Sequence, residues 1–248
     1  MKLFSKRSER YPEPDETDAV QGGARAALAA IPVIGGTVNE ILSLVLAPAV
    51  SRRRDEWFKE LADGLDRLEE KVDGVRIENL AENEAFVSAS IQASRTALGT
   101  HRREKREYLR NALMNIASGR APEEEWHDFL MQLVEDLTPL HVRLLRFFDN
   151  PYHFVPSERL EELNRHVKVH GMPPASSPIS EMERSLPNLA GKRTLYEPVL
   201  QDLHARRLLI SPLDMLQDGL VPDEHGAFQR RTSTLGARFL AFINEPEL

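Results

Sequence analysis

The feature of this 248-residue chain that most constrains its fold is an apolar stretch from Ala26 to Val50. The stretch has the length of a membrane-spanning helix but carries one charged residue, Glu40. Pro32, the Gly35-Gly36 pair and Pro48 interrupt it. A carboxylate at the centre of a bilayer also costs roughly 2.5–3.5 kcal/mol. We therefore expect no simple, permanent membrane span.

Two interpretations of this stretch remain open. In the first, Val38 to Leu46 is a core helix of a soluble bundle, and the sequence IPVIGG forms the turn that enters it. In the second, the segment is sheltered at rest and can insert into a membrane or contact a partner, with Glu40 neutralised in an oligomer. The residues that would make these contacts are Ile34, Val38, Glu40, Ile41, Leu44 and Val45.

Composition restricts the compartment and the ligands. Hydrophobic residues make up 41% of the chain and charged residues 29%, which is typical of a soluble protein rich in surface helix. There are no cysteines, so disulfides and thiolate metal sites are excluded. No apolar region directly follows the basic N-terminus, so we expect a cytoplasmic protein, with membrane association left open. The net charge of −7 disfavours a nucleic-acid partner.

Helical periodicity organises the chain between a polar leader (residues 1–24) and residue 137. Ser51 is placed to cap a long helix whose apolar positions recur every three or four residues. This stripe predicts either core packing or self-association, through Phe58, Leu61, Leu65, Leu68 and Val72. Further helices are expected at about 84–98, 101–118 and 123–137. Residues 25–137 should therefore form a helical bundle.

Basic residues gather at the start of the helix over 101–118 and near the C-terminus. Glu104 and Glu107 interrupt the first group and can pair with it, which favours an ordinary solvated face. Binding of an anionic ligand, such as lipid or nucleic acid, is the alternative. The candidate residues are Arg102, Arg103, Lys105, Arg106, Arg206, Arg207, Arg230 and Arg231.

Residues 138–248 follow a different pattern. Thr138-Pro139 predicts the cap and first residue of a helix that reaches Phe148. An amphipathic helix over 194–210 is followed by a strand-and-turn stretch and a last helix, the order found in a winged helix. Because Glu197 and Asp202 lie on the would-be recognition helix, we expect docking onto protein rather than DNA. The expected fold is mainly α, a helical bundle followed by a winged-helix-like α+β module.

Sequence motifs of enzymes are missing. The chain lacks the phosphate-binding GxxxxGK[ST], the dinucleotide-binding GxGxxG, the nucleophile motif GxSxG and the zinc motif HExxH. His166 and His170 are four residues apart, a spacing that can place two imidazoles on one helical face. Gly171 should end that helix, however, and no third ligand is near in sequence. We expect a non-enzyme with no cofactor and no metal site.

Five segments occur in an order that points to a group of known proteins. They are IPVIGG (31–36), RRRDEWFKELADGLDRLEEKV (52–72), ENLAENEAF (78–86), EKREYLRNALMNIAS (104–118) and DLTPLHVRLLRFFDNP (136–151). Over about residues 26–151 the chain resembles uncharacterised bacterial all-helical proteins, which are themselves loosely similar to the abortive-infection alpha family. None of the five segments holds a catalytic motif, so no functional residue can be transferred.

The resemblance implies a function. It suggests a role in bacterial antiphage defence, by growth arrest or death of the infected cell. Together with the interrupted apolar stretch, it favours a non-enzymatic helical effector that acts on a membrane or on a partner through residues 26–50. The alternatives are a winged-helix regulator that binds DNA and a protein-docking adaptor. As partners we expect a second copy of the chain or another protein, with a membrane as the next choice and nucleic acid disfavoured.

Overall fold

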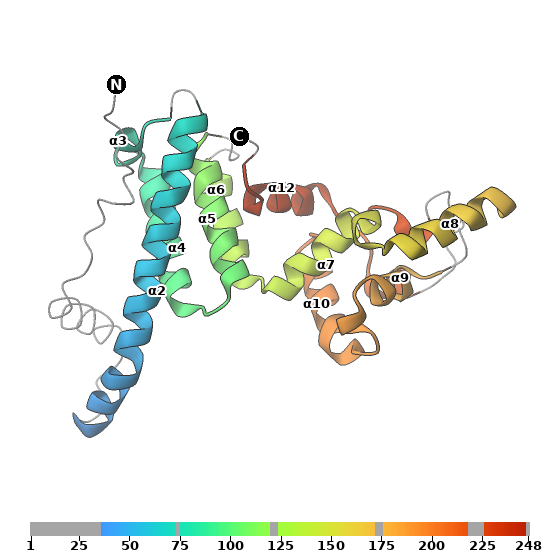
Figure 1. The fold of residues 1–248 in the computed structure, drawn as a ribbon, viewed down its shortest axis with the longest axis horizontal. Coiled ribbons are helices and arrows are strands. Elements are labelled where there is room, and N and C mark those ends of the chain that lie inside the picture. The colour runs from blue at the N-terminus through green and yellow to red at the C-terminus, as the bar shows by residue number, and fades with distance from the viewer. Residues whose placement is uncertain (1–35, 73–74, 120–123, 172–175, 218–225, 247–248) are drawn as a thin grey trace. The chain divides into compact units, whose positions relative to one another are not determined.

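A computed structural model of the protein describes residues 36–72, 75–119, 124–171, 176–217 and 226–246. The predicted leader and Ile34 lie outside these ranges. The chain divides into two compact units. Unit 1 contains Met1–Glu135 and Phe242–Leu248, and unit 2 contains Asp136–Ala241. Figure 1 labels the helices of both units.

Unit 1 is a helical bundle built on the long helix α2 (Gly36–Lys71). It also contains α3 (Ile77–Leu80), α4 (Glu84–Gly99), α5 (Arg103–Ala117) and all but the last residue of α6 (Glu124–Asp136). The prediction of a helical bundle is confirmed here. The expected bounds of α4, α5 and α6 are close to the observed ones.

Small residues let α4 lie close to its neighbours. Ala89, Ala93 and Ala97 recur every fourth residue, so they share one face of the helix, and all three are buried. α4 packs against α5, where Leu109 and Leu113 are completely buried. Because alanine leaves little bulk between the two backbones, the leucines of α5 can fill the space at close range.

The predicted start of α2 is wrong. The sequence places a break at Pro48 and a cap at Ser51, whereas the helix begins at Gly36 and runs through both residues. A proline inside a helix removes one backbone hydrogen bond and costs about 3 kcal/mol. Pro48 is exposed and lies in a part of α2 where no side chain from 46 to 56 is buried, so the hydrogen bond is not lost inside a packed core. The alanines on both sides of Pro48 are the best helix formers, and they reduce the cost further.

Unit 2 is a set of short helices. They are α7 (Pro139–Asp149), α8 (Ser157–His170), α9 (Pro178–Ser185), α10 (Arg193–Ala205), α11 (Leu213–Gln217) and α12 (Thr234–Ile243, to residue 241 in this unit). Short 3-10 turns occur at Pro151–Phe154, Pro187–Leu189 and Gly226–Phe228. α7 packs against α10. The core contains fully buried side chains from these two helices and α12, among them Leu144, Phe147, Tyr196, Leu203 and Phe239.

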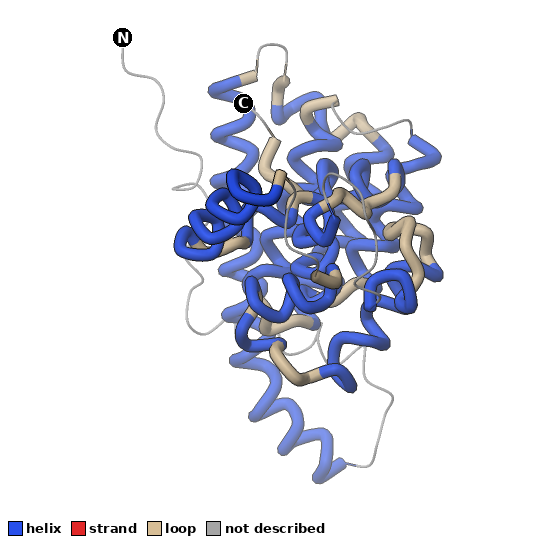
Figure 2. Tube along the Cα trace, turned by 90° about the vertical axis from the view of Figure 1, so that its right-hand side faces the viewer, coloured by secondary structure: helices blue, strands red, loops and turns tan. Residues whose placement is uncertain are grey.

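The predicted winged-helix-like α+β module is wrong. Across the ranges that the structure describes there is no β-strand, and Figure 2 shows only helices and loops in its coloured part. Where the sequence predicts strands, the chain forms one isolated antiparallel bridge, between Leu209 and Thr232. Unit 2 is therefore an all-helical unit in its described part.

Local chemistry explains why the bridge does not grow into a sheet. Pro212 has no N–H group to donate to a ladder, and α11 begins at the next residue. On the other side, the N–H of Arg231 donates to the carbonyl oxygen of Phe148, at 2.8 Å, instead of to a partner strand. The backbone also changes direction just before the bridge, because Arg207, the second residue after α10, has a positive φ of 59°.

Candidate functional site

α2 continues beyond the helices that it packs against. Burial of side chains in α2 is described from Leu46 onward; none of the side chains from 46 to 56 is buried, and Trp57 is buried, with 0% exposure. In Figure 1 the blue N-terminal end of α2 extends past the ends of α4 and α5. We call residues 36–52 of this helix the α2 arm.

Two side-chain contacts mark the point where the α2 arm ends and the bundle begins. Arg53 Nη1 donates to the carbonyl oxygen of Leu98, at 3.3 Å, near the end of α4. One turn further along α2, Trp57 Nε1 donates to Ser94 Oγ at 2.9 Å. These contacts hold α2 antiparallel to α4. The α2 arm is thus the N-terminal continuation of a helix that the bundle anchors.

The sequence of the α2 arm has a narrow polar side. At about 100° per residue, three polar residues fall on one side of the helix and the branched apolar residues fall opposite them. The polar residues are Asn39, Glu40 and Ser43, and the opposite side holds Val38, Ile41 and Val45. All predicted contact residues except Ile34 therefore lie in the α2 arm. None of the helices in the described ranges combines the length and the apolar character needed to cross a membrane.

The stripe predicted for self-association lies on α2, inside the bundle region. Leu68 is buried, with 1% exposure, whereas Phe58, Leu61, Leu65 and Val72 are half-buried.

The buried positions of α2 from residue 46 onward are Trp57, Gly64 and Leu68, so the buried face shares Leu68 with the predicted stripe but includes Trp57 and Gly64 instead of the adjacent Phe58 and Leu65. The predicted stripe does not include Trp57, although Trp57, Leu61, Gly64 and Leu68 are also spaced by four, three and four residues.

The structure divides the predicted basic surface at the start of α5. Arg102 and Arg103 are exposed to solvent. Lys105 is buried, and its Nζ donates to the carbonyl oxygen of Glu135 at 2.9 Å. A cation at this position suits the negative C-terminal end of α6. Lys105 thus belongs to the packing of the bundle.

Arg106 also contacts another helix of the bundle. Its Nη1 lies 3.2 Å from Glu56 Oε2, and its Nη2 lies 3.4 Å from Glu60 Oε1. The arginine has only 9% exposure, while both carboxylates are on the adjoining turn of α2. Arg106 therefore joins α5 to α2 just after the α2 arm.

Three of the four predicted basic residues in unit 2 also have partners. Arg230 pairs with Asp149 at 2.8 Å, and the buried Arg231 donates from Nη1 to Ser211 Oγ at 3.2 Å. Arg206 belongs to the network described next, and Arg207 is exposed. The eight predicted residues thus do not form one continuous basic surface in either unit.

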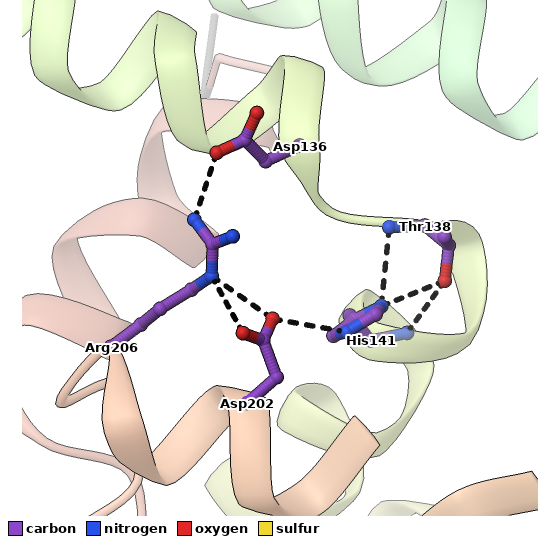
Figure 3. A network of polar contacts seen from close by, with 5 residues as sticks. All are labelled: Asp136, Thr138, His141, Asp202 and Arg206. Carbon is purple, nitrogen blue, oxygen red and sulfur yellow. Dashed lines mark hydrogen bonds and ion pairs between the residues drawn. The ribbon is translucent and has the colours of Figure 1, made fainter. Parts of the chain in front are cut away.

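Arg206 is the centre of a charged network between the end of α6 and α10 (Figure 3). Its Nη1 lies 2.9 Å from Asp136 Oδ2, and its Nε donates to both oxygens of Asp202, at 2.9 and 3.1 Å. The hydrogen bond to Asp136, followed by the contacts to Asp202, raises the pKa of Arg206. Its positive charge is therefore present at every working pH.

His141 extends this network to the start of α7. Its Nε2 lies 3.3 Å from Asp202 Oδ2 (Figure 3). Its Nδ1 lies 2.8 Å from Thr138 Oγ1 and accepts the backbone N–H of Thr138 at 3.3 Å. Because Nδ1 accepts this hydrogen bond, the proton of the neutral ring belongs on Nε2, pointing at Asp202.

A hydroxyl, an imidazole and a carboxylate that contact one another in this order also make up the catalytic triad of many hydrolases. Here the hydroxyl is the N-cap of α7, and the imidazole completes the reciprocal capping box as the third helical residue. The Nδ1 lone pair that a general base needs is already engaged by a backbone N–H. We interpret Thr138, His141 and Asp202 as a brace between α7 and α10.

The chain was compared with known proteins in three ways. No protein-family model matches it, and neither the curated proteins nor the solved structures include a match. The resemblance to the abortive-infection alpha family is therefore left as a hypothesis.

Proposed function

We propose that the protein is a non-enzymatic helical effector that works by self-association through the α2 arm. The observation that supports this most is the arm itself, a continuation of an anchored helix along which no side chain from 46 to 56 is buried. Leu46 has 38% exposure, and the neighbouring Pro48 is also exposed. Apolar surface held away from a core is typical of an interaction site.

The apolar side of the α2 arm favours a second copy of the chain as its partner. By helical periodicity, Val38, Ile41 and Val45 fall on one side of the arm and Glu40 falls on the other. When two arms pair antiparallel about a twofold axis, the apolar side of each copy packs against the apolar side of the other.

Glu40 sits on the polar side of the α2 arm by helical periodicity, so its carboxylate can stay solvated in a helix pair. Burial of the same carboxylate in a bilayer would cost roughly 2.5–3.5 kcal/mol. A helix pair therefore fits this sequence better than a membrane does.

The biological setting that we propose is bacterial antiphage defence. The segment order over residues 26–151 supports it through its resemblance to the abortive-infection alpha proteins. In this setting, assembly through the α2 arm is the step that stops growth of the infected cell. The rest of unit 1 would serve to hold the arm in position.

Matched variants of the α2 arm test this proposal. Ile41→Lys places a charge on the apolar side, and Ser43→Lys places the same charge on the polar side two residues away. Size-exclusion chromatography with light scattering should give an oligomer for wild type and Ser43→Lys, and a monomer for Ile41→Lys. In plaque assays with a host that depends on the protein for protection against phage, wild type and Ser43→Lys should protect and Ile41→Lys should not. A fully protective, oligomeric Ile41→Lys protein would refute the proposal.

Flotation with liposomes distinguishes the membrane alternative. Wild-type protein should stay in the soluble fraction in the presence of vesicles of phosphatidylglycerol and phosphatidylethanolamine. A protein that floats with these vesicles while remaining a monomer would replace self-association with membrane binding as the role of the α2 arm.

A further inference from the structure

The last two turns of α8 stand apart from the core of unit 2. Leu160 and Leu163 pack against a small cluster formed by Val155, Ala227 and Phe228. Beyond Leu163, every side chain of α8 is exposed or half-buried. The C-terminal half of α8 is therefore open to solvent along its described length.

A glycine cap keeps these exposed turns helical. Gly171 has φ of 76°, the left-handed conformation that glycine adopts without strain, and its N–H donates to the carbonyl oxygen of Val167 at 2.8 Å. As a result the helix extends through His170. The four-residue spacing between His166 and His170 is then a true helical spacing, which places both side chains on one face.

The two imidazole rings of this face lie against each other. The ring centroids of His166 and His170 are 4.3 Å apart, and the ring planes are inclined by 37°. His170 is exposed and His166 is half-buried. Two imidazoles held together on a solvated helix can offer two nitrogen ligands to one metal ion, and zinc binds imidazole nitrogen at about 2.0–2.1 Å.

The remaining ligands of such an ion would not come from this helix face. No group of three or more histidine, aspartate or glutamate side chains in the described ranges is arranged to hold a metal. Glu162, one turn before His166, already pairs with Arg159 at 2.7 Å. An ion bound by the two histidines therefore keeps open positions, which water or an external donor can fill.

We propose that His166 and His170 form a bidentate surface site for a divalent transition-metal ion of the copper, nickel and zinc class. Imidazole nitrogen suits these ions, and affinity should be highest for copper, according to the Irving–Williams order. Magnesium and calcium, which prefer oxygen ligands, should not bind there. The site is independent of the α2 arm and of the function proposed for it.

Calorimetric titration of the untagged, full-length protein with Cu²⁺, Ni²⁺ and Zn²⁺ tests this site. His166→Ala and His170→Ala should each weaken binding by more than roughly tenfold, because even loss of an outer-shell partner typically costs 10–100-fold. His101→Ala is the matched control, since His101 is an exposed histidine without a neighbouring imidazole in the described part of α5 and its cap. It should leave the affinity unchanged.

Electron paramagnetic resonance of the Cu²⁺-loaded protein provides a second measurement. The wild-type spectrum should show hyperfine coupling to two imidazole nitrogens, and each single variant should show coupling to one. Circular dichroism would confirm that both variants keep their helix content. Equal affinity of wild type and His166→Ala, or a wild-type spectrum with a single imidazole, would overturn the proposal.

Discussion

His141 Nε2 lies 3.3 Å from Asp202 Oδ2, and this contact ties the first turn of α7 to the last turn of α10. The same carboxylate accepts from Arg206, which in turn reaches Asp136. Each of these pairs is partly exposed, so each contributes only about 0–1 kcal/mol. The way these contacts are linked matters more than their individual energies, because together they fix the orientation of His141, which completes the cap of α7.

Removal of the cap hydroxyl should weaken unit 2. Thr138→Ala removes the acceptor for the N–H of His141 and the partner of its Nδ1. We expect the free energy of unfolding to fall by about 1 kcal/mol, the usual cost of a lost N-cap. Thr138→Ser keeps the hydroxyl and should stay close to wild type. Urea denaturation of both variants measures this, and equal losses for Ala and Ser would show that the hydroxyl has no role.

Stability should depend on pH through Tyr196. Burial, followed by the hydrogen bond to Glu183 Oε1 at 2.8 Å, raises the pKa of Tyr196 to about 12. In the unfolded chain the pKa of tyrosine is about 10, so between these values the folded protein holds more protons than the unfolded chain. The stabilisation is complete below about pH 10 and is lost as the pH rises through about 12.

The variant Tyr196→Phe isolates this effect. Between about pH 9 and about pH 11, wild type should lose roughly 1 kcal/mol more of its free energy of unfolding than the variant does. Chemical denaturation at the two pH values gives both differences. If the free energy of unfolding depended on pH identically in the two proteins, the pKa of Tyr196 would not be raised by folding.

A close backbone contact should make Gly236 intolerant of a side chain. A methyl group at this position would overlap the carbonyl oxygen of Leu208 and come within 2.6 Å of Thr232 Cγ2. We expect Gly236→Ala to lower the free energy of unfolding by about 1–3 kcal/mol, as overpacking does. Gly99→Ala in α4 meets nothing within 4 Å and should be neutral or slightly stabilising. Thermal unfolding of the two alanine variants would test the difference, and equal melting temperatures would contradict it.

Neighbouring arginines of α5 and its cap should behave differently. Arg106→Ala leaves Glu56 and Glu60 without their shared partner, and should cost about 1–2 kcal/mol, since both carboxylates are partly solvated. Arg102→Ala should change the free energy of unfolding very little, because Arg102 is exposed. Urea denaturation would show whether the two substitutions can be told apart. An Arg106→Ala protein with the free energy of unfolding of wild type would show that Arg106 does not stabilise unit 1.

Local signals were sufficient to predict most of the helices. The pair Thr138-Pro139 predicts the start of α7, and the structure confirms the cap. Gly171 predicts the end of α8 and adopts the expected left-handed conformation. Caps and glycine stops depend on a few adjacent residues, so a sequence alone reveals them.

Contacts between distant residues could not be predicted in the same way. The choice between Trp57 and Phe58 as the inward residue of α2 depends on Ser94, which receives the Trp57 N–H from another helix. The burial of Lys105 depends on the carbonyl group of Glu135, thirty residues further along the chain. No local pattern separates a lone bridge from a strand, because whether the pairing continues is decided by tertiary contacts of the backbone N–H groups.

The most direct test of self-association through the α2 arm is a pair of matched charge substitutions. Ile41→Glu places a carboxylate on the apolar side of the arm and should abolish pairing, whereas Ser43→Glu places the same charge on the polar side and should leave the dimer intact. Analytical ultracentrifugation of wild type and both variants is the measurement. A dimer for wild type and Ser43→Glu, with a monomer for Ile41→Glu, is the expected result, and three proteins with the same mass in solution would contradict it.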